Sequence, residues 1–348
     1  MKKFIFNKIM EYKTKNFFSK LKEFLNFSDN IVIISHQNPD GDAISSSLGL
    51  FHFLKKKYEN KKINIIVPNN FHHFLKWLKK SNEIIIFSEN ETYSIELIKK
   101  ANLIFCLDFN SMLRTGDLEN LIISSKAKKV LIDHHPSPEI EQFDLILSKE
   151  SASSASEVLY NFIEILGEKK LIDKNIAECI FTGISSDTNS FSVNSNSLTH
   201  KIVSEILEIG VDKEKVQKNL FHSFSFDKMK LTAYVLSEKM KIFPKYNLGL
   251  ISLSAEEKEK FNFEVGDSEN FANLPMSIKD IEISAFFTNY KDFIKISFRS
   301  MGNFNANLFA RKYFNGGGHK KASGGKSYKN MEETIEDFLF YIKEFLNN

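Results

Sequence analysis

Residues 31–50 read IVIISHQNPDGDAISSSLGL, and the rest of the chain is organised around this stretch. The first four residues favour a β-strand, a polar turn follows, and a helical apolar pattern begins at Ala43. The turn carries His36, Asp40 and Asp42, together with a proline that stiffens it and a glycine that lets it bend. Imidazole and carboxylate groups at the end of a strand suit a divalent cation such as Mn²⁺ or Mg²⁺. The alternative is a polar loop in which Asp42 only caps the helix.

Length, charge and cysteine content limit the class of protein. The chain has 348 residues, enough for two domains with cores of their own. A net charge of +3 is too small for a protein that coats nucleic acid, so we expect no long duplex partner. No apolar run reaches the roughly 18 to 20 residues that a membrane span needs. Cys106 and Cys179 lie in apolar runs and are predicted to be buried free thiols, which favours a reducing compartment and a cytoplasmic protein.

Three predicted strands end in carboxylates or imidazoles. They are residues 31–34 before His36, residues 101–107 before Asp108, and residues 129–132 before Asp133, His134 and His135. Almost wholly apolar runs of this kind are typical of parallel sheets that are covered on both faces. Because ligand sites of open α/β sheets lie beyond the carboxyl ends of the strands, we expect these side chains to converge.

One further carboxylate, Asp187, lies in a predicted small-residue turn that follows a helix. With the strand-end groups it completes a candidate set of His36, Asp40, Asp42, Asp108, His134 and Asp187. Carboxylates brought together repel each other and raise each other's pKa values, and no lysine or arginine lies within these motifs. Two divalent cations about 3.5 to 4 Å apart, bridged by a carboxylate and a water, remove this repulsion and yield a hydroxide near neutral pH. Mixed histidine and aspartate ligation favours Mn²⁺ over Mg²⁺.

The pattern of elements predicts an α/β fold, with a mainly parallel sheet flanked by helices and a second, smaller α/β domain. We place a catalytic domain at residues 1–210, a helical linker at 211–241 and a substrate-binding domain at 242–348. The linker is predicted to begin with one long helical connection, residues 211–236. Residues 1–24 are basic and aromatic, and we expect a helix that packs on the first domain, with contact to a membrane surface as the alternative.

The second domain carries a candidate phosphate site. Its members are Arg299, Gly316, Gly317, Gly318 and His319. The glycines allow backbone N–H groups to approach an anion closely, and the histidine adds a donor. The chain has three arginines, and Arg299, at the end of a predicted strand, is the best candidate for a bidentate phosphate clamp. Taken alone, the glycines could be a helix C-cap and loop. Arg311 is a weaker candidate than Arg299, and Arg114 is the weakest.

Together these motifs resemble those of the DHH phosphoesterase superfamily. The resemblance rests on HQNPDGDA at residues 36–43, on Asp108, on DHH at residues 133–135 and on Asp187. The glycine cluster with His319 resembles the motif of the C-terminal domain associated with that family. The resemblance to the family covers nearly the whole chain. Within the family, the chain most resembles the small two-domain nanoRNase and 3′-phosphoadenosine 5′-phosphate phosphatase group.

The resemblance implies a role for each site residue. The metal ligands would form two sets, one of His36 and Asp40 and one of Asp42, His134 and Asp187, with Asp108 bridging them. Asp133 would orient a histidine, as ligating imidazoles usually require. His135 would lie beside the scissile phosphate and help to stabilise its developing charge. The second domain would hold the substrate.

The implied activity is Mn²⁺-dependent hydrolysis of very short oligoribonucleotides to mononucleotides and of 3′-phosphoadenosine 5′-phosphate to AMP. Alternatives with the same chemistry are a phosphodiesterase for cyclic or linear dinucleotides, a single-strand DNA exonuclease and a manganese pyrophosphatase. A non-catalytic nucleotide-binding protein is an alternative from another class, and the presence of every expected ligand disfavours it. A homodimer remains open, because the sequence gives no interface.

Overall fold

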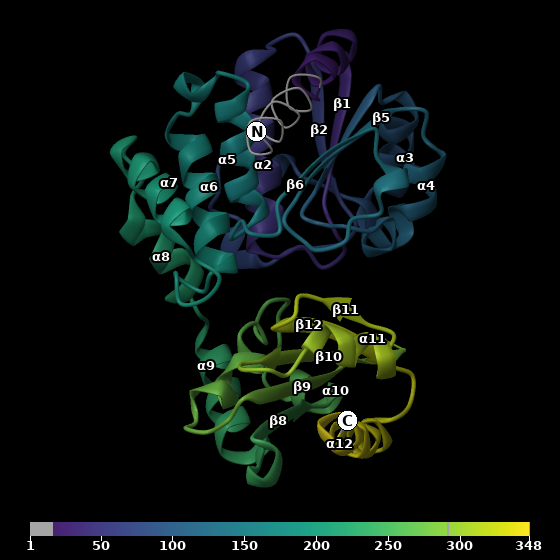
Figure 1. The fold of residues 1–348 in the computed structure, drawn as a ribbon, viewed down its shortest axis with the longest axis vertical. Coiled ribbons are helices and arrows are strands. Elements are labelled where there is room, and N and C mark those ends of the chain that lie inside the picture. The colour runs from purple at the N-terminus through teal and green to yellow at the C-terminus, as the bar shows by residue number, and fades with distance from the viewer. Residues whose placement is uncertain (1–16, 291, 348) are drawn as a thin grey trace, which may run out of the picture. The chain divides into compact units, whose positions relative to one another are not determined.

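The structure, a computed structural model, describes residues 17–290 and 292–347 (Figure 1). The chain divides into two compact units, Met1–Ser223 and Phe224–Asn348. Each unit is built on one six-stranded sheet with helices, so the predicted α/β fold with a second α/β domain is confirmed. Most of the N-terminal segment lies outside the described residues. Residues 17–27 are helical, and Leu21 and Leu25 on this helix are buried in the core of the first unit.

The first sheet is parallel throughout, with strand order β3-β2-β1-β4-β5-β6. Its strands are β1 (Asn30–Ile34), β2 (Lys62–Val67), β3 (Ile85–Ile86), β4 (Leu103–Leu107), β5 (Lys128–Asp133) and β6 (Leu145–Ser148). The order reverses at β1, which pairs with β2 on one side and β4 on the other. A crevice at the carboxyl ends of the strands is expected where the order reverses, between β1 and β4.

Helices cover both faces of this sheet (Figure 1). The helices of this unit are α2 (Gly41–Lys57), α3 (Glu91–Lys100), α4 (Glu119–Ser124), α5 (Ala155–Ile165), α6 (Lys174–Asp187), α7 (Ser197–Glu208) and α8 (Lys213–Phe221). Of these, α7 and α8 pack against α6 rather than against the sheet. Ile31 and Ile33 of β1 face the core under α2, α5 and α6. Val32 and Ile34 of the same strand face a second core under α3 and α4. Burial on both faces explains why these strands are continuous apolar runs.

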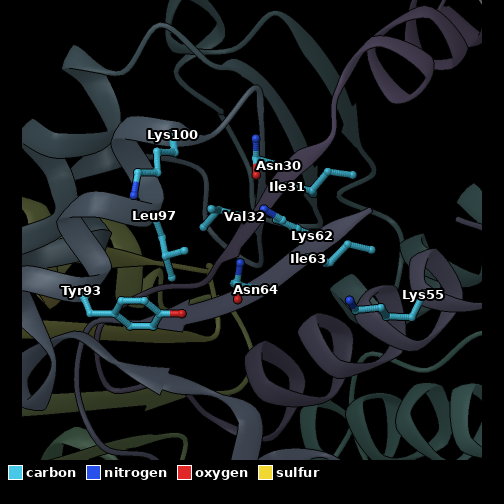
Figure 2. Close-up of a pocket in the computed structure, with 10 residues that line it drawn as sticks. All are labelled: Asn30, Ile31, Val32, Lys55, Lys62, Ile63, Asn64, Tyr93, Leu97 and Lys100. Atoms are coloured by element: carbon cyan, nitrogen blue, oxygen red, sulfur yellow. The ribbon is translucent and has the colours of Figure 1, made fainter. Parts of the chain in front are cut away.

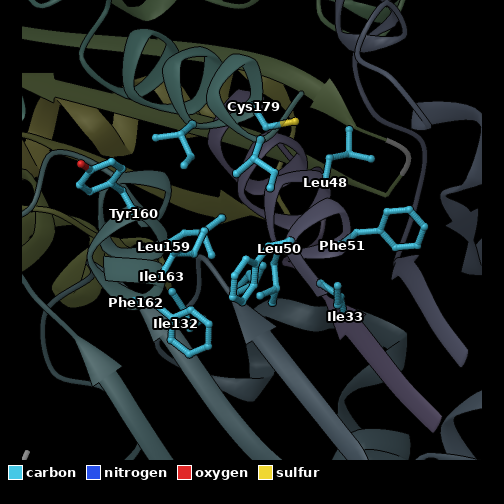
Figure 3. Packing of buried hydrophobic residues seen from close by; sticks show 14 of the residues in the cluster. Ile33, Leu48, Leu50, Phe51, Ile132, Leu159, Tyr160, Phe162, Ile163 and Cys179 are labelled. Atoms are coloured by element: carbon cyan, nitrogen blue, oxygen red, sulfur yellow. The ribbon is translucent and has the colours of Figure 1, made fainter. Parts of the chain in front are cut away.

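The larger core is packed closely between α2, α5 and the sheet (Figure 3). Gly49 of α2 lets Leu159 of α5 approach, since a β-carbon on Gly49 would lie 2.9 Å from a methyl group of Leu159. Cys179 of α6 is buried in this core, and Cys106 is buried in the other. Both cysteines are free, so the prediction of buried thiols is confirmed.

The second sheet is mixed, with strand order β11-β12-β10-β9-β8-β7. Its strands are β7 (Met240–Phe243), β8 (Leu248–Leu253), β9 (Ile283–Tyr290), β10 (Phe293–Ser300), β11 (Gly317–Gly318) and β12 (Ala322–Ser327). Its helices are α9 (Phe226–Tyr234), α10 (Ala255–Lys260), α11 (Ala306–Tyr313) and α12 (Met331–Asn347). Only β8 and β9 pair in parallel among these described strands. Packed rings of Phe298, Phe309 and Phe338 join β10, α11 and α12 in one core.

Two predictions of local structure were wrong. The single helical connection at residues 211–236 is two helices, α8 and α9, with a break at residues 222–225. The side chain of Ser225 accepts a hydrogen bond from the backbone N–H of Lys228 and so caps a new helix start. Asp187 is the last residue of α6 rather than part of a turn. The helix thus carries this carboxylate directly.

A pocket of about 380 Å³ lies at the amino ends of β1 and β2 (Figure 2). Its lining includes Lys55, Lys62 and Lys100, with Asn64 and Tyr93. It therefore lies at the edge of the sheet opposite the predicted site. Among the described residues, no helix is both long and apolar enough to cross a bilayer.

Candidate metal centre

The carboxyl ends of β1, β4 and β5 bring the predicted strand-end residues together. The strands are neighbours in register, with Ile34 beside Cys106 and Leu107 beside Ile132. Asp108 follows β4 and lies in the middle of the group. Its Oδ2 is 3.4 Å from Nε2 of His36, and its Oδ1 is 3.4 Å from Nε2 of His134. All three side chains are buried, so they form one site at the predicted edge of the sheet.

The first set of potential ligands is His36, Asp40 and Asp108. Oδ1 of Asp40 caps α2 by accepting from the backbone N–H groups of Asp42 and Ala43, both at 3.1 Å. Oδ2 of Asp40 lies 3.8 Å from Nε2 of His36. Nδ1 of His36 lies 2.9 Å from the carbonyl oxygen of Gln37, so Nδ1 carries the proton and Nε2 presents its lone pair to the site.

The second set is Asp42, His134 and Asp187. Nε2 of His134 lies 3.1 Å from Oδ2 of Asp187. Asp42 is fully buried, and its two carboxylate oxygens accept from the backbone N–H groups of Ala155 at 2.6 Å and Ser156 at 3.0 Å. The N-terminus of α5 thus holds Asp42 in place and favours its negative charge.

Two glycines allow the helices that carry these ligands to meet closely. A β-carbon on Gly183 of α6 would lie 2.5 Å from Oδ1 of Asp42 and 2.0 Å from Oγ of Ser156. A β-carbon on Gly41 at the start of α2 would lie 2.1 Å from Oγ of Ser186. Any larger side chain would push α2 and α6 apart, and Asp42 away from Asp187. Neither glycine was predicted from sequence to have this role.

The donor set fits two divalent cations that share Asp108. In each set, the potential ligand atoms lie within 4.8 Å of one another. Nε2 of His36 and Oδ1 of Asp108 are buried and, within the described part of the chain, have no hydrogen-bond partner of good geometry. Buried polar atoms of this kind are costly unless something binds them. The residue at the centre, Asp108, also has a left-handed backbone with φ of 64°, which a tightly held functional residue can retain.

Burial and crowding change the acidity of these groups. Burial raises the pKa of Asp42 well above its usual value, and the neighbouring carboxylates of Asp108 and Asp187 add to this. Burial also raises the pKa of Asp187, to about 6. Burial opposes ionisation of Asp108, but the imidazoles of His134 and His36 hold its pKa well below the ordinary value. Burial would lower the pKa of His134, yet Asp108 and Asp187 raise it well above the usual range. Protons thus balance the charge in the metal-free protein, as cations would in the metal-bound one.

Beside the metal ligands, Asp133, His135 and Arg114 form a chain of contacts. Nδ1 of His135 lies 2.8 Å from Oδ1 of Asp133, and Nη1 of Arg114 lies 2.8 Å from Nε2 of His135. Burial and the negative charge of Asp108 raise the pKa of Asp133 to about 7. Arg114 was the weakest of the three arginines as a phosphate candidate from sequence, and the structure places it beside the metal ligands. The rarity of arginine in this chain was the signal that could have drawn attention to it.

The candidate phosphate residues lie together in the second unit. Arg299 on β10 pairs with Ala322 on β12, and β12 pairs in turn with β11, which is Gly317–Gly318. Gly318 has φ of 141°, and the backbone N–H of His319 donates to the carbonyl oxygen of Ala322 at 2.8 Å. A β-carbon on Gly316 would lie 2.0 Å from the carbonyl oxygen of Gly324. This close packing requires glycine whether or not the loop binds an anion.

Comparison with known proteins agrees with this geometry. A model for the N-terminal domain of the DHH family matches residues 30–184, and one for the DHHA1 domain matches residues 248–348. A solved structure of an exopolyphosphatase-related protein from Bacteroides fragilis is 40% identical, with a TM-score of 0.88 over 95% of this chain and 96% of that chain. The chain belongs to the DHH family. It is accordingly a metal-dependent phosphoesterase, and the two matched domains fall in the two units of the structure.

Two curated DHH relatives have described activities. The bifunctional oligoribonuclease and PAP phosphatase NrnA of Bacillus subtilis is 29% identical over 91% of this chain and 96% of its own length. The cyclic-di-AMP phosphodiesterase GdpP of Bacillus subtilis is 26% identical over 93% of this chain but only 49% of its own length. The two relatives resemble this chain to a similar degree and differ in their substrates.

Proposed function

We propose that this DHH protein hydrolyses short oligoribonucleotides to mononucleotides and 3′-phosphoadenosine 5′-phosphate to AMP. The observation that carries the proposal is the pair of ligand sets that share Asp108. Similarity to NrnA over nearly its whole length supports the choice of substrate. The two buried free cysteines accord with action in the cytoplasm.

Each of the two ligand sets is proposed to hold one cation. His36, Asp40 and Asp108 would hold one cation, and Asp42, His134 and Asp187 would hold the other. Mixed nitrogen and oxygen donors favour Mn²⁺, with Mg²⁺ as the alternative. When bound, the two cations would supply a hydroxide near neutral pH and polarise the phosphoryl group.

The protein groups around the cations have separate tasks. The Asp133 carboxylate accepts the Nδ1 proton of His135 and so fixes the ring with Nε2 directed away from Asp133. His135 would stabilise charge on the scissile phosphate once Nε2 is protonated as well, because only then can Nε2 donate to a phosphate oxygen. The backbone N–H groups at the start of α5 hold Asp42 in one orientation, so this ligand needs no rearrangement when a cation binds.

The second unit would bind the rest of the substrate. Arg299 and the loop of Gly316, Gly317, Gly318 and His319 would hold a terminal phosphate and nucleotide. A dedicated grip on the end of the substrate limits its length, which suits a nanoRNase better than an enzyme for long strands.

A second candidate is a phosphodiesterase for cyclic or linear dinucleotides. The similarity to GdpP favours it, although this chain spans only about half of that protein. A nucleotide-binding protein without activity is the remote alternative. An intact set of ligands in close geometry argues against it.

One substrate panel separates these functions. The purified protein with Mn²⁺ is given di- to pentaribonucleotides, 3′-phosphoadenosine 5′-phosphate, a linear and a cyclic di-adenosine dinucleotide, and pyrophosphate, and products are followed by chromatography. We expect mononucleotides from the oligonucleotides and AMP from the bisphosphate. Faster turnover of the cyclic dinucleotide would favour the second candidate. No turnover of any compound by manganese-loaded protein would contradict both.

A further inference from the structure

Arg114 is placed at the metal centre by the loop that follows β4. This loop runs from Asp108 into the 3₁₀ helix Met112–Leu118. The carbonyl oxygen of Arg114 accepts from the backbone N–H of Gln37 at 2.7 Å, so the loop is tied to the one after β1. Gly116, with φ of 58°, leaves room for the side-chain amide of Gln37, from which a β-carbon would lie 3.1 Å away. The backbone at Arg114 is therefore held from one side.

The loop is also tied to the segment that follows β5. The Glu139 carboxylate accepts from Oγ of Ser111 at 2.7 Å and from the backbone N–H of Met112 at 3.0 Å. The backbone N–H of Glu139 donates to the carbonyl oxygen of Asn110 at 2.8 Å, and Nδ2 of Asn110 donates to the carbonyl oxygen of Pro136 at 2.7 Å. Because it is fixed to both neighbouring loops, the half-buried Arg114 side chain is held at the centre rather than left in solvent.

The contact with His135 shows how the guanidinium is presented. A guanidinium can only donate hydrogen bonds, so Nη1 of Arg114 donates and Nε2 of His135 accepts. The ring proton is then on Nδ1, where Asp133 accepts it. The contact employs Nη1, and a guanidinium has five N–H donors in a planar fork that matches phosphate oxygens. In this contact Arg114 is the donor and His135 is the acceptor, and both lie beside the metal ligands.

The positive charge of Arg114 offsets negative charge at the metal centre. The potential ligand clusters contain five carboxylates, those of Asp40, Asp42, Asp108, Asp133 and Asp187. Two divalent cations offset four of these charges when all five are ionised, which leaves a net negative site that would repel a phosphodiester. The guanidinium stays protonated in proteins and offsets the fifth charge. With Arg114 present, the metal-bound site of the first unit would carry no net negative charge and could bind a phosphate without net repulsion.

We propose that Arg114 binds the non-bridging oxygens of the substrate phosphate beside His135, as the phosphate-binding arginine of the catalytic unit. The proposal rests on the phosphoesterase function above but not on which nucleotide is the substrate. A lysine at this position would keep the charge but lose the planar fork, so Arg114→Lys should restore only part of the binding.

The test measures binding of inorganic phosphate to the manganese-loaded protein by calorimetry, alongside Mn²⁺ stoichiometry by electron paramagnetic resonance. Arg114→Gln should weaken phosphate binding about 10- to 100-fold and leave two Mn²⁺ bound. Arg114→Lys should lie between Arg114→Gln and the unaltered protein. Lys100→Gln, which removes a positive charge at the opposite edge of the same sheet, should change neither quantity.

Phosphate affinity that does not change in Arg114→Gln would overturn the proposal. If kcat also fell while KM stayed the same, Arg114 would only position His135. Wild-type protein that binds phosphate through Arg114 yet cleaves no nucleotide would refute the proposed function and support this inference.

Discussion

The two edges of the first sheet differ in how deeply their ionisable side chains are buried. At the carboxyl edge, most of the carboxylates and imidazoles are buried, and within each ligand set the potential ligand atoms lie within 4.8 Å of one another. At the amino edge, lysines line the pocket (Figure 2) and are at least partly exposed. One of them, Lys100, pairs with Glu96 at 3.2 Å. Buried like charge is costly and persists only where something compensates it, whereas surface pairs contribute little. The candidate metal centre is therefore distinguished by the burial of its ionisable side chains and not by their number.

The largest effect is expected from the residue shared by both ligand sets. Asp108→Asn should lose both cations and reduce turnover by about 10³-fold or more, because two-metal chemistry depends on the bridge. Metal content and phosphoesterase rate are measured on the same preparation. Asp144→Asn is the matched control, since Asp144 pairs with Lys128 at the amino edge and should leave both unchanged. Retention of two cations by Asp108→Asn would contradict the bridging assignment.

A smaller loss is expected when only one ligand set is changed. Asp187→Ala should remove one cation and lower turnover by about 10²- to 10³-fold, since the set around His36 stays intact. The circular dichroism spectrum should not change, because the carboxylate of Asp187 is partly exposed at the end of α6. Turnover equal to wild type would remove Asp187 from the site.

The metal-free protein should respond to pH at the carboxyl edge. A raised carboxyl pKa means that the folded state holds its proton more tightly than the unfolded chain. Asp187 and Asp133 therefore lower stability as pH rises from about 4 to about 6 and 7 respectively. Mn²⁺ must displace these protons, so its affinity should rise about tenfold per pH unit up to about 6.

Thermal unfolding with and without Mn²⁺ between pH 5 and pH 8 measures this effect. We expect the melting temperature of the metal-free protein to fall with rising pH and the gain from Mn²⁺ to grow. A gain that is the same at every pH would mean that no proton is displaced by the cation.

The smallest effect is expected at the amino edge. Lys62→Gln removes an exposed positive charge from the pocket lining and should change the free energy of unfolding by less than about 0.5 kcal/mol. Turnover should match the wild type. Chemical denaturation and the substrate panel together check this. A large loss of activity would mean that the two edges do not differ as described.

Much of the metal site could be predicted from local sequence. The apolar runs before His36, Asp108 and Asp133 fixed the strand ends, and parallel pairing then dictated that they meet. Arg114 escaped prediction because its place depends on loop-to-loop hydrogen bonds and on a left-handed Gly116, which have no sequence periodicity. The close approach at Gly183 escaped for a similar reason, since it joins residues more than a hundred positions apart.

In the second unit and the segment that leads to it, local sequence likewise predicted regular elements but not the features that depend on tertiary packing. The hairpin of β9 and β10 was predicted from its alternating pattern and is present, with Phe293 opposite Tyr290, although Lys291 in its turn lies outside the described residues. The break between α8 and α9 was missed because the apolar pattern continues through it. A capping serine competes there with helix propagation, and tertiary packing decides between them.

The central claim is best tested by anomalous diffraction at the manganese edge from crystals of the full chain grown with Mn²⁺. Two peaks about 3.5 to 4 Å apart are expected at the carboxyl ends of β1, β4 and β5, with one oxygen of Asp108 on each ion. A single peak, or two ions that do not share Asp108, would contradict the account.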